Sequence, residues 1–162
     1  MNTYLFVDSL NLFSAGGSYR GYMINWIKGH NDNSEIKFKT LAVHDGAFSV
    51  ISKFYSTDEL WFQKSEFFPP AKIGYNPFDN KKIREGFDKN SPEEFVKNWK
   101  ISRIIMHDGR DYRVLLTEGL SSFTSLKLKG IYIKLSYFPQ ENHWVLKAEN
   151  QIMKLKTGLI NI

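Results

Sequence analysis

Cysteine is absent from this 162-residue sequence. Its absence excludes disulfide bonds, thiolate zinc sites and cysteine nucleophiles. No apolar run approaches the roughly 18 residues that a membrane-spanning helix needs. The first residues, MNTYLFVDSLNLF, lack the basic segment of a signal peptide. We therefore expect a cytoplasmic protein.

Motifs for catalysis and metal binding are also scarce. The four histidines, His30, His44, His107 and His143, do not pair at metal-ligand spacing. His44 and His107 each precede Asp-Gly, which favours a role in a turn over a role as a general base. The sequence shows no Gly-rich phosphate loop and no nucleophile elbow. We therefore expect no catalytic residue, no metal and no cofactor, and a binding protein more readily than an enzyme.

The charge of the chain is unevenly distributed. Its net charge is +5. The first 99 residues hold twelve Lys or Arg and twelve Asp or Glu, whereas residues 100–162 hold ten and five. All of the excess positive charge therefore lies in the second part, which favours a polyanion as its partner. A solvated lysine-rich surface would give the same distribution.

Alternating apolar and polar residues predict several β-strands. Residues 36–43 alternate in this way and are followed by Asp45-Gly46. Asp-Gly between two apolar runs is a strong hairpin signal, because Gly accepts a positive φ without steric cost. The repeated His-Asp-Gly could also mark an internal duplication. Further strands are expected at residues 60–63, 101–106, 112–117, 125–138, 144–148 and 152–156.

Helices are expected to be short. Ser91-Pro92, followed by two acids, predicts the start of a helix. Weaker helices are expected at residues 22–28 and 79–87. Together these elements predict an α+β fold dominated by antiparallel strands. The expected domains are a small β-barrel-like module at residues 1–75, a helical connector at 76–99 and a basic β-meander at 100–162.

The hairpin segment VHDGAF resembles the KOW motif of ribosomal and transcription-elongation proteins. Val43, Asp45, Gly46 and Phe48 match that pattern. The resemblance implies a small β-barrel that binds nucleic acid, as in the basic DNA-binding transcription modifiers of tailed phages. It implies DNA more readily than RNA, a nucleoid-associated location and contact with the transcription machinery. An ordinary β-hairpin would show the same residues.

The basic second part supplies the candidate nucleic-acid-binding surface. In a strand, Lys127 and Lys129 would share one face, and Lys154 and Lys156 would share another. Lysines release counterions from phosphates, and exposed aromatic rings stack on bases. A solvated amphipathic sheet with its aromatics in the core is the alternative. The candidate binding residues are Arg103, Arg110, Arg113, Lys127, Lys129, Lys134, Lys154, Lys156, Tyr132 and Trp144.

Two other classes of function remain open. The segment YLFVDSLNLF, residues 4–13, resembles the opening of PIN-like and NYN nucleases. That resemblance implies a metal-dependent nuclease with Asp8 as first ligand and Asn11 as its neighbour, although Asp8 could equally cap a helix. A structural or assembly protein of a virus particle is the other alternative. The leading prediction is a non-enzymatic, weakly sequence-specific DNA-binding protein that modulates transcription.

Overall fold

A computed structural model describes residues 7, 8, 10–30, 37–67 and 77–160 of the chain. None of its helices is long and apolar enough to span a membrane, among the residues so described. In chain order the elements are β1 (Leu12–Gly17), α1 (Tyr19–His30), β2 (Phe38–His44), α2 (Val50–Ser56), α3 (Leu60–Phe67), α4 (Lys81–Asn90), the 3-10 helix η2 (Pro92–Asn98), β3 (Ser102–Asp108), α5 (Leu116–Leu128), β4 (Ile133–Phe138) and α6 (Ala148–Ile160).

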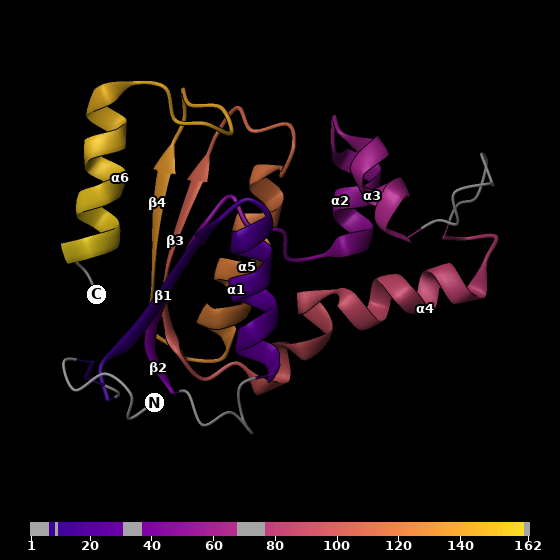
Figure 1. Cartoon of the computed structure of the whole chain (residues 1–162), viewed down its shortest axis with the longest axis horizontal. Helices are drawn as coiled ribbons and strands as arrows, with labels where there is room; N and C mark the ends of the chain where they lie inside the picture. Colours follow the sequence, from indigo (N-terminus) through magenta and orange to yellow (C-terminus); the bar gives the residue numbers. More distant parts are fainter. Residues whose placement is uncertain (1–6, 9, 31–36, 68–76, 161–162) are drawn as a thin grey trace.

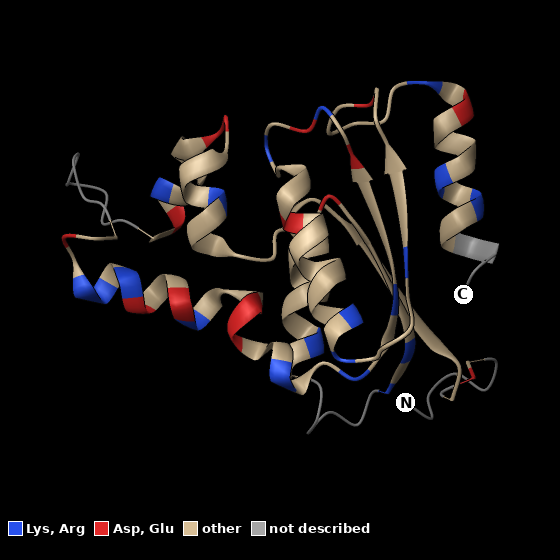
Figure 2. Ribbon diagram, turned by 180° about the vertical axis from the view of Figure 1, so that it is seen from behind, with Lys and Arg blue, Asp and Glu red and all other residues tan. Residues whose placement is uncertain are grey.

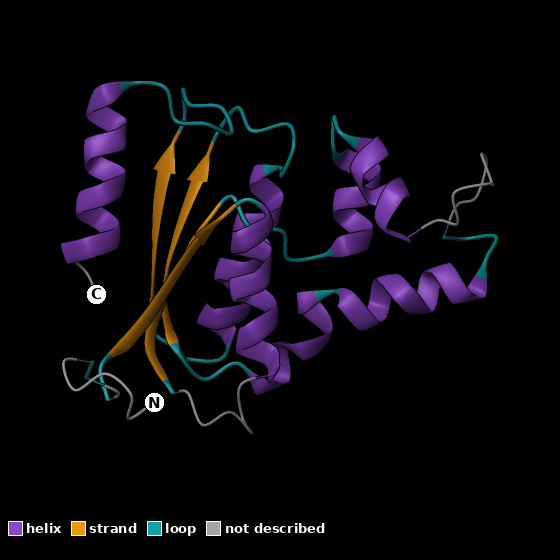
Figure 3. Cartoon of the chain, viewed as in Figure 1, coloured by secondary structure: helices purple, strands orange, loops and turns teal. Residues whose placement is uncertain are grey.

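The strands form one parallel sheet in the order β1-β2-β3-β4 (Figure 1). Its central strands are apolar, and Leu41, Ala42 and Val43 of β2 and Ile104 and Ile105 of β3 are at most 2% exposed. Continuous apolar runs of this kind are typical of strands that are buried on both faces. Helices α1 and α5 accordingly cover one face of the sheet, and α6 lies on the other (Figure 3).

The largest core cluster joins the sheet to the helices beside it. Leu126 of α5 packs with Ile105 of β3 and Ile133 of β4. Phe48 and Trp99 complete the cluster, with their rings edge to face and the centroids 5.7 Å apart. Because Phe48 lies just after β2, this packing fixes the loop that leaves the carboxyl end of that strand.

The predicted α+β fold of mostly antiparallel strands is wrong. Strands β2 and β3, which come from the expected first and third domains, pair in parallel. A parallel pair needs a crossover connection and cannot be closed by a tight hairpin. After Asp45-Gly46 the chain therefore enters α2, and no return strand follows. The described residues form neither an N-terminal barrel nor a C-terminal meander, because their strands share one sheet.

Helix α5 shows why the second part resembled a series of strands. The strands expected at residues 112–117 and 125–138 both overlap this helix. Its buried face carries Glu118 and Ser122 beside Leu126. Polar side chains at these positions remove the apolar helical period on which a sequence-based helix prediction depends. The apolar residues at the two ends of α5 therefore resemble parts of strands in the sequence.

The last part of the strand expected at 125–138 is confirmed as β4. Three other expected strands are wrong. Residues 60–63 lie in α3, and residues 152–156 lie in α6. Residues 144–147 form the loop that leads into α6, and Ala148 is the first residue of that helix. The strand at 101–106 is confirmed as β3, with bounds shifted by one or two residues.

The helix signals were more reliable. The helix expected at residues 22–28 is confirmed within α1, and the one at 79–87 corresponds to α4. Ser91-Pro92 does start a helix, although η2 is of the 3-10 type and the Ser91 side chain makes no capping hydrogen bond. Proline at the first helical position indicates a helix start from local stereochemistry, independently of the packing around it.

Candidate active site

Ser18 occupies a sharp turn between β1 and α1. Its φ of 56° lies in the left-handed region, which residues other than glycine rarely adopt. The Ser18 N–H donates to the carbonyl oxygen of His44, and the Ser18 carbonyl accepts from the N–H of Tyr22, both at 2.9 Å. A strained strand-to-helix turn that exposes a serine is the nucleophile elbow of serine hydrolases.

Glycines allow this turn to pack closely. A Cβ on Gly21 would lie 2.9 Å from the Cα of Gly46 and 2.9 Å from the oxygen of His44. A Cβ on Gly16 would lie 2.5 Å from the oxygen of Arg20. The usual elbow has Gly two residues after the nucleophile, but Arg20 occupies that position here and is exposed. Gly21 provides the close approach one residue later.

His143 lies against the hydroxyl of Ser18. Its Nδ1 is 2.6 Å from Oδ2 of Asp111, and its Nε2 is 2.8 Å from Oγ of Ser18. A carboxylate can only accept, so Nδ1 carries the ring proton and Nε2 is free to accept from the Ser18 hydroxyl. This tautomer is the one that a general base needs in order to activate a serine.

Asp111 is held in its ionised form. Asp111 is only 2% exposed. Its Oδ1 accepts from the N–H groups of Arg113 at 2.9 Å and Val114 at 3.0 Å. Burial opposes ionisation, but the hydrogen bonds from His143 and from these backbone groups outweigh it and hold the pKa of Asp111 below its ordinary value. Asp111 can therefore orient His143 and stabilise its protonated ring.

The three residues lie at the same end of the sheet, where its strands terminate. Ser18 follows β1, Asp111 follows β3 and His143 follows β4. The carboxyl ends of parallel strands face one side of an α/β sheet, which is where such folds place their sites. The order Ser, Asp, His along the chain is also that of the α/β hydrolases.

The backbone N–H of Tyr19 begins the helix that follows Ser18. Tyr19 is the residue after the nucleophile and the first residue of α1. The first N–H groups of an α-helix have no partner within the helix, and they point toward its positive end. In α/β hydrolases the N–H at this position forms part of the oxyanion hole.

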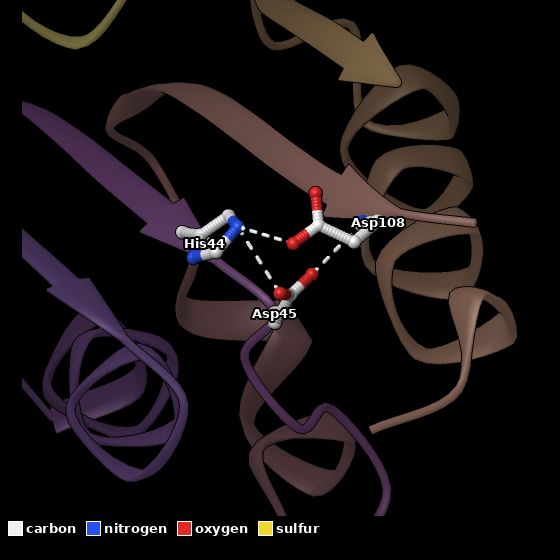
Figure 4. Close-up of side chains that lie close together, drawn as sticks. All are labelled: His44, Asp45 and Asp108. Carbon is white, nitrogen blue, oxygen red and sulfur yellow. Dashed lines mark hydrogen bonds and ion pairs between the residues drawn. The ribbon is translucent and has the colours of Figure 1, made fainter. Parts of the chain in front are cut away.

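His44, Asp45 and Asp108 form a second polar cluster (Figure 4). Asp45 brings this cluster next to His143. The two His-Asp-Gly segments meet here because β2 and β3 are adjacent and parallel. Nε2 of His44 is 2.9 Å from Oδ2 of Asp108 and 3.1 Å from Oδ2 of Asp45. The N–H of Asp108 donates to Oδ1 of Asp45 at 3.0 Å. Both carboxyl groups are completely buried.

One of these two carboxyl groups is neutral. Burial, followed by the hydrogen bond and charge of Asp108, raises the pKa of Asp45 to about 10. Lys154 donates from Nζ to Nδ1 of His44 at 2.9 Å, so the His44 ring proton lies on Nε2 and faces Asp108. Oδ2 of Asp45 is 4.0 Å from Nδ1 of His143. A neutral Asp45 therefore adds no second negative charge next to the catalytic histidine.

The same atoms have the spacing of metal ligands. Those of His44, Asp45 and Asp108 lie within 4.8 Å of one another, as do those of Asp45, Asp111 and His143. Asp111 and His143 are committed to Ser18, and both ring nitrogens of His44 already make hydrogen bonds. Hydrogen bonds thus engage both histidines and Asp111, whereas Oδ2 of Asp45 and Oδ1 of Asp108 have no hydrogen-bond partner among the described residues.

A pocket of about 840 Å³ opens beside Ser18 and His143. Helices α2 and α3 form one of its walls, with Val50 and Phe62 among the lining residues. Val114, from the loop that holds Asp111, contributes to it as well. The nucleophile therefore faces a cavity large enough for a side chain of a bound substrate.

The structure separates the predicted nucleic-acid-binding lysines. Lys127 lies on α5 and Lys129 at its C-terminal end, whereas Lys154 and Lys156 lie on α6, on the opposite face of the sheet. Lys134 belongs to β4. Figure 2 shows Lys and Arg spread over helices, strands and loops on different sides of the molecule. These lysines do not form a single basic face.

The predicted arginines and aromatics are also dispersed. Arg103 is 1% exposed, contacts Asn25 and Ser122, and lies over the ring of Trp99 at 4.8 Å. It is part of the core and not of a binding surface. Tyr132 precedes β4 and Trp144 follows it, at opposite ends of the strand, and Arg110 and Arg113 lie in the loop after β3. Arg113, Trp144 and Lys154 line the pocket beside Ser18.

Asp8 does not have the surroundings of a nuclease site. It is exposed, and its carboxylate accepts from the N–H of Leu10 at 2.9 Å and from Nδ2 of Asn11 at 2.5 Å. These local hydrogen bonds lower the pKa of Asp8. Asp8 precedes β1 and Ser18 follows it, so the two residues lie at opposite ends of that strand. Residues 4–6 and 9 of the segment lie outside the described residues.

The fold and the hydrogen-bonded series Asp111–His143–Ser18 define the chain as an α/β hydrolase with a serine triad. Comparison with known sequences narrows this class. The sequence model of the prolyl oligopeptidase family matches residues 1–159. The chain belongs to the prolyl oligopeptidase family.

Individual relatives agree with this assignment. The chain is 37% identical over 147 residues to dipeptidyl-peptidase 5 of Schizosaccharomyces pombe, which covers 91% of the chain and 20% of the relative. It is 39% identical over 148 residues to dipeptidyl-peptidase 5 of Aspergillus oryzae, covering 91% and 19%. The acylaminoacyl peptidase of Pyrococcus horikoshii matches 85% of the chain and 20% of its own, with a TM-score of 0.69 and 28% identity. The chain spans about a fifth of the length of these relatives.

These findings correct the functional predictions. The KOW resemblance is wrong. The segment VHDGAF contains the end of β2 and the loop after it, and it does not form the hairpin of a small barrel. Nucleic acid as partner, transcription as process and a phage origin are wrong as well, since the relatives are peptidases. The nuclease and virus-structure alternatives are overturned by the same family match.

None of the triad residues was predicted. The sequence shows no complete nucleophile elbow, because Arg20 replaces the last glycine of the Gly-x-Ser-x-Gly pattern around Ser18. A usable signal was present nonetheless, since Gly16 and Ser18 match the first two fixed positions of this pattern. His143 gave no such signal, because its partner Asp111 is 32 residues away and meets it only in the fold.

Proposed function

We propose that this chain carries the catalytic triad of a serine peptidase. The observation that carries the proposal is the unbroken series of hydrogen bonds from Asp111 through His143 to Ser18. Membership of the prolyl oligopeptidase family supports peptides as the substrate class. The similarity to dipeptidyl-peptidase 5 supports, more specifically, release of dipeptides from a peptide N-terminus.

The geometry supports hydrolysis in two steps. Oγ of Ser18 attacks the scissile carbonyl carbon while Nε2 of His143 accepts the hydroxyl proton. His143 then donates that proton to the leaving amine as the C–N bond breaks, which leaves the acyl group esterified to Ser18. Water adds to the ester and gives a proton to His143, and this proton returns to Ser18 as the carboxylic acid departs. Asp111 stabilises the protonated ring throughout, and the Tyr19 N–H donates to the oxyanion.

A fluorophosphonate probe tests the nucleophile directly, because it phosphonylates an activated serine. We expect the wild-type protein to be labelled and to hydrolyse dipeptidyl coumarin amides. Ser18→Ala should abolish both, whereas Ser121→Ala, on the exposed side of α5, should change neither. Equal labelling of wild type and Ser18→Ala would overturn the proposal.

A further inference from the structure

The pocket beside Ser18 carries more positive than negative charge. Apolar residues such as Val50 and Phe62 form part of its wall, and six charged residues complete the lining. Such an excess favours an anionic group in the bound ligand. The charged residues are Arg20, Lys53, Arg113 and Lys154 on the positive side and Glu59 and Glu66 on the negative side.

Three of the four positively charged side chains are either paired with another protein group or exposed to solvent. Nε of Arg113 lies 3.1 Å from Oε1 of Glu59, which neutralises both groups. Lys154 donates to Nδ1 of His44 at 2.9 Å and so supports the cluster behind the triad. Arg20 is exposed to solvent. The fourth cation differs from all of these.

Lys53 is a half-buried cation without a hydrogen-bond or ion-pair partner among the described residues. It lies on α2, with Nζ 5.7 Å from the ring centroid of Phe62 on α3. Within the part of the chain that the structure describes, no carboxylate oxygen lies within 4.0 Å of this Nζ and no acceptor bonds to it. Burial lowers the pKa of Lys53, and the more distant charges of four carboxylates only partly oppose this, namely Glu118, Glu59, Asp111 and Asp58. A partly desolvated ammonium gains from any carboxylate that reaches it.

Gln63 indicates that the same wall receives polar groups. It is 4% exposed, and its Nε2 donates to the carbonyl oxygen of Val50 at 3.0 Å. Its Oε1 has no hydrogen-bond partner among the described residues. A buried acceptor without a partner is unfavourable, and an N–H of a bound peptide would satisfy it.

We propose that Lys53 makes this pocket selective for Asp or Glu as the residue whose carbonyl carbon Ser18 attacks. The inference rests on the proposed peptidase function and adds its substrate preference. That residue stays attached to Ser18 in the acyl-enzyme, so its side chain is the one closest to the pocket. Its carboxylate pairs with the Lys53 ammonium in a site that is partly shielded from water.

A dipeptidyl coumarin amide series tests the preference. The first residue is kept constant and the second is Glu, Asp, Gln, Ala or Lys. We expect kcat/KM for Glu or Asp to exceed that for Gln by about tenfold or more, as a partly buried charge-assisted hydrogen bond provides. The Glu to Gln ratio of the wild type is informative without any variant.

Variants of one position assign the preference to its charge. Lys53→Met keeps the length of the side chain and should bring the Glu to Gln ratio close to one, whereas Lys53→Arg should preserve it. Lys53→Glu should favour Lys as the second residue of the substrate. Lys64→Gln removes the same charge from the exposed side of α3, away from the pocket, and should leave the ratio unchanged.

The outcomes separate the two proposals. Wild-type protein that reacts with a fluorophosphonate and cleaves the Glu, Gln and Ala substrates equally well would overturn the role of Lys53 and leave the peptidase function intact. A ratio that survives in Lys53→Met would also overturn it. Protein that neither reacts nor cleaves any of the substrates would overturn the peptidase function, and this inference with it.

Discussion

The backbone N–H of Asp108 donates to Oδ1 of Asp45 at 3.0 Å, and this bond joins the ends of two neighbouring parallel strands. The second oxygen of Asp45 lies 4.0 Å from Nδ1 of His143. His143 therefore has a second carboxyl group beside it, that of Asp45, which does not belong to the triad. The protonation of Asp45 determines how much negative charge surrounds the ring of His143.

Asp45 predicts a loss of stability at higher pH. Its pKa rises from 3.8 to about 10 on folding, so between these values the folded protein holds a proton that the unfolded chain has released. The free energy of unfolding must fall as pH rises through this interval. Asp45→Asn keeps a neutral polar group and removes that loss.

Thermal unfolding followed by circular dichroism measures the effect. We expect Tm of Asp45→Asn to depend less on pH between pH 5 and pH 8 than Tm of the wild type, by roughly 2–4 °C for each kcal/mol removed. Asp58→Asn, at an exposed position, is the control. Parallel pH profiles for wild type and Asp45→Asn would show that Asp45 is ionised.

Asp111→Asn should separate catalysis from folding. Asparagine can still accept from the N–H groups of Arg113 and Val114, but it no longer holds the Nδ1 proton of His143. We expect kcat to fall by about 10⁴-fold while the circular dichroism spectrum is unchanged. Asp88→Asn on α4 removes a carboxylate that does not line the pocket and should retain full activity. Activity within tenfold of wild type would remove Asp111 from the mechanism.

Gly21→Ala should disturb the nucleophile elbow. The added Cβ would lie 2.9 Å from the Cα of Gly46 and from the oxygen of His44, so the backbone must move. We expect about 1–3 kcal/mol of destabilisation and loss of fluorophosphonate labelling. Gly86→Ala is the matched control on α4, where the Cβ meets only a Phe67 carbon at 3.8 Å.

Denaturant unfolding compares the two glycine variants. Gly86→Ala should be stabilised by about 0.5–1 kcal/mol, because alanine loses less conformational entropy in a helix. If Gly21→Ala were as stable and as reactive as the wild type, the close packing of the elbow would not restrict this position.

Glu118 should be needed for its acceptor oxygen and not for its charge. Its Oε2 accepts from the N–H groups of Phe48 at 2.8 Å and Ser49 at 2.7 Å, and burial raises its pKa. Glu118→Ala leaves both N–H groups buried without a partner and should cost about 1–3 kcal/mol, measured by denaturant unfolding. Glu118→Gln retains an acceptor and should cost less than half as much. Equal losses in the two variants would assign the effect to charge.

Local signals in the sequence identified several elements but not their arrangement. The apolar run of β3 and the Pro92 helix start were correct, because both depend on residues close together in the chain. The parallel pairing of β2 with β3 joins residues about 60 positions apart, as in the pair Leu41 and Arg103, and no local pattern reports it. The Asp45-Gly46 signal failed because Asp45 uses its φ of 45° to reach Asp108 and not to reverse the chain.

The site was missed for a related physical reason. Arg103 and Lys154 looked like members of an exposed basic face, yet the first is buried over Trp99 and the second donates to His44. Charge counting cannot distinguish a solvated cation from one that the fold has paired. A motif that allows a residue other than glycine two positions after the serine would have identified Ser18, because Gly16 and Ser18 match its other fixed positions.

Ser18 and His143 are 125 positions apart and follow β1 and β4, the two outer strands of the sheet that the structure describes. The hydroxyl therefore acquires its base only when both edges have docked on the central pair. Helices form locally and early, whereas long-range parallel pairing is slow. Reactivity of this serine thus reports that the four described strands have paired, so a chain that has formed its helices but not these pairings does not react with a serine-directed probe.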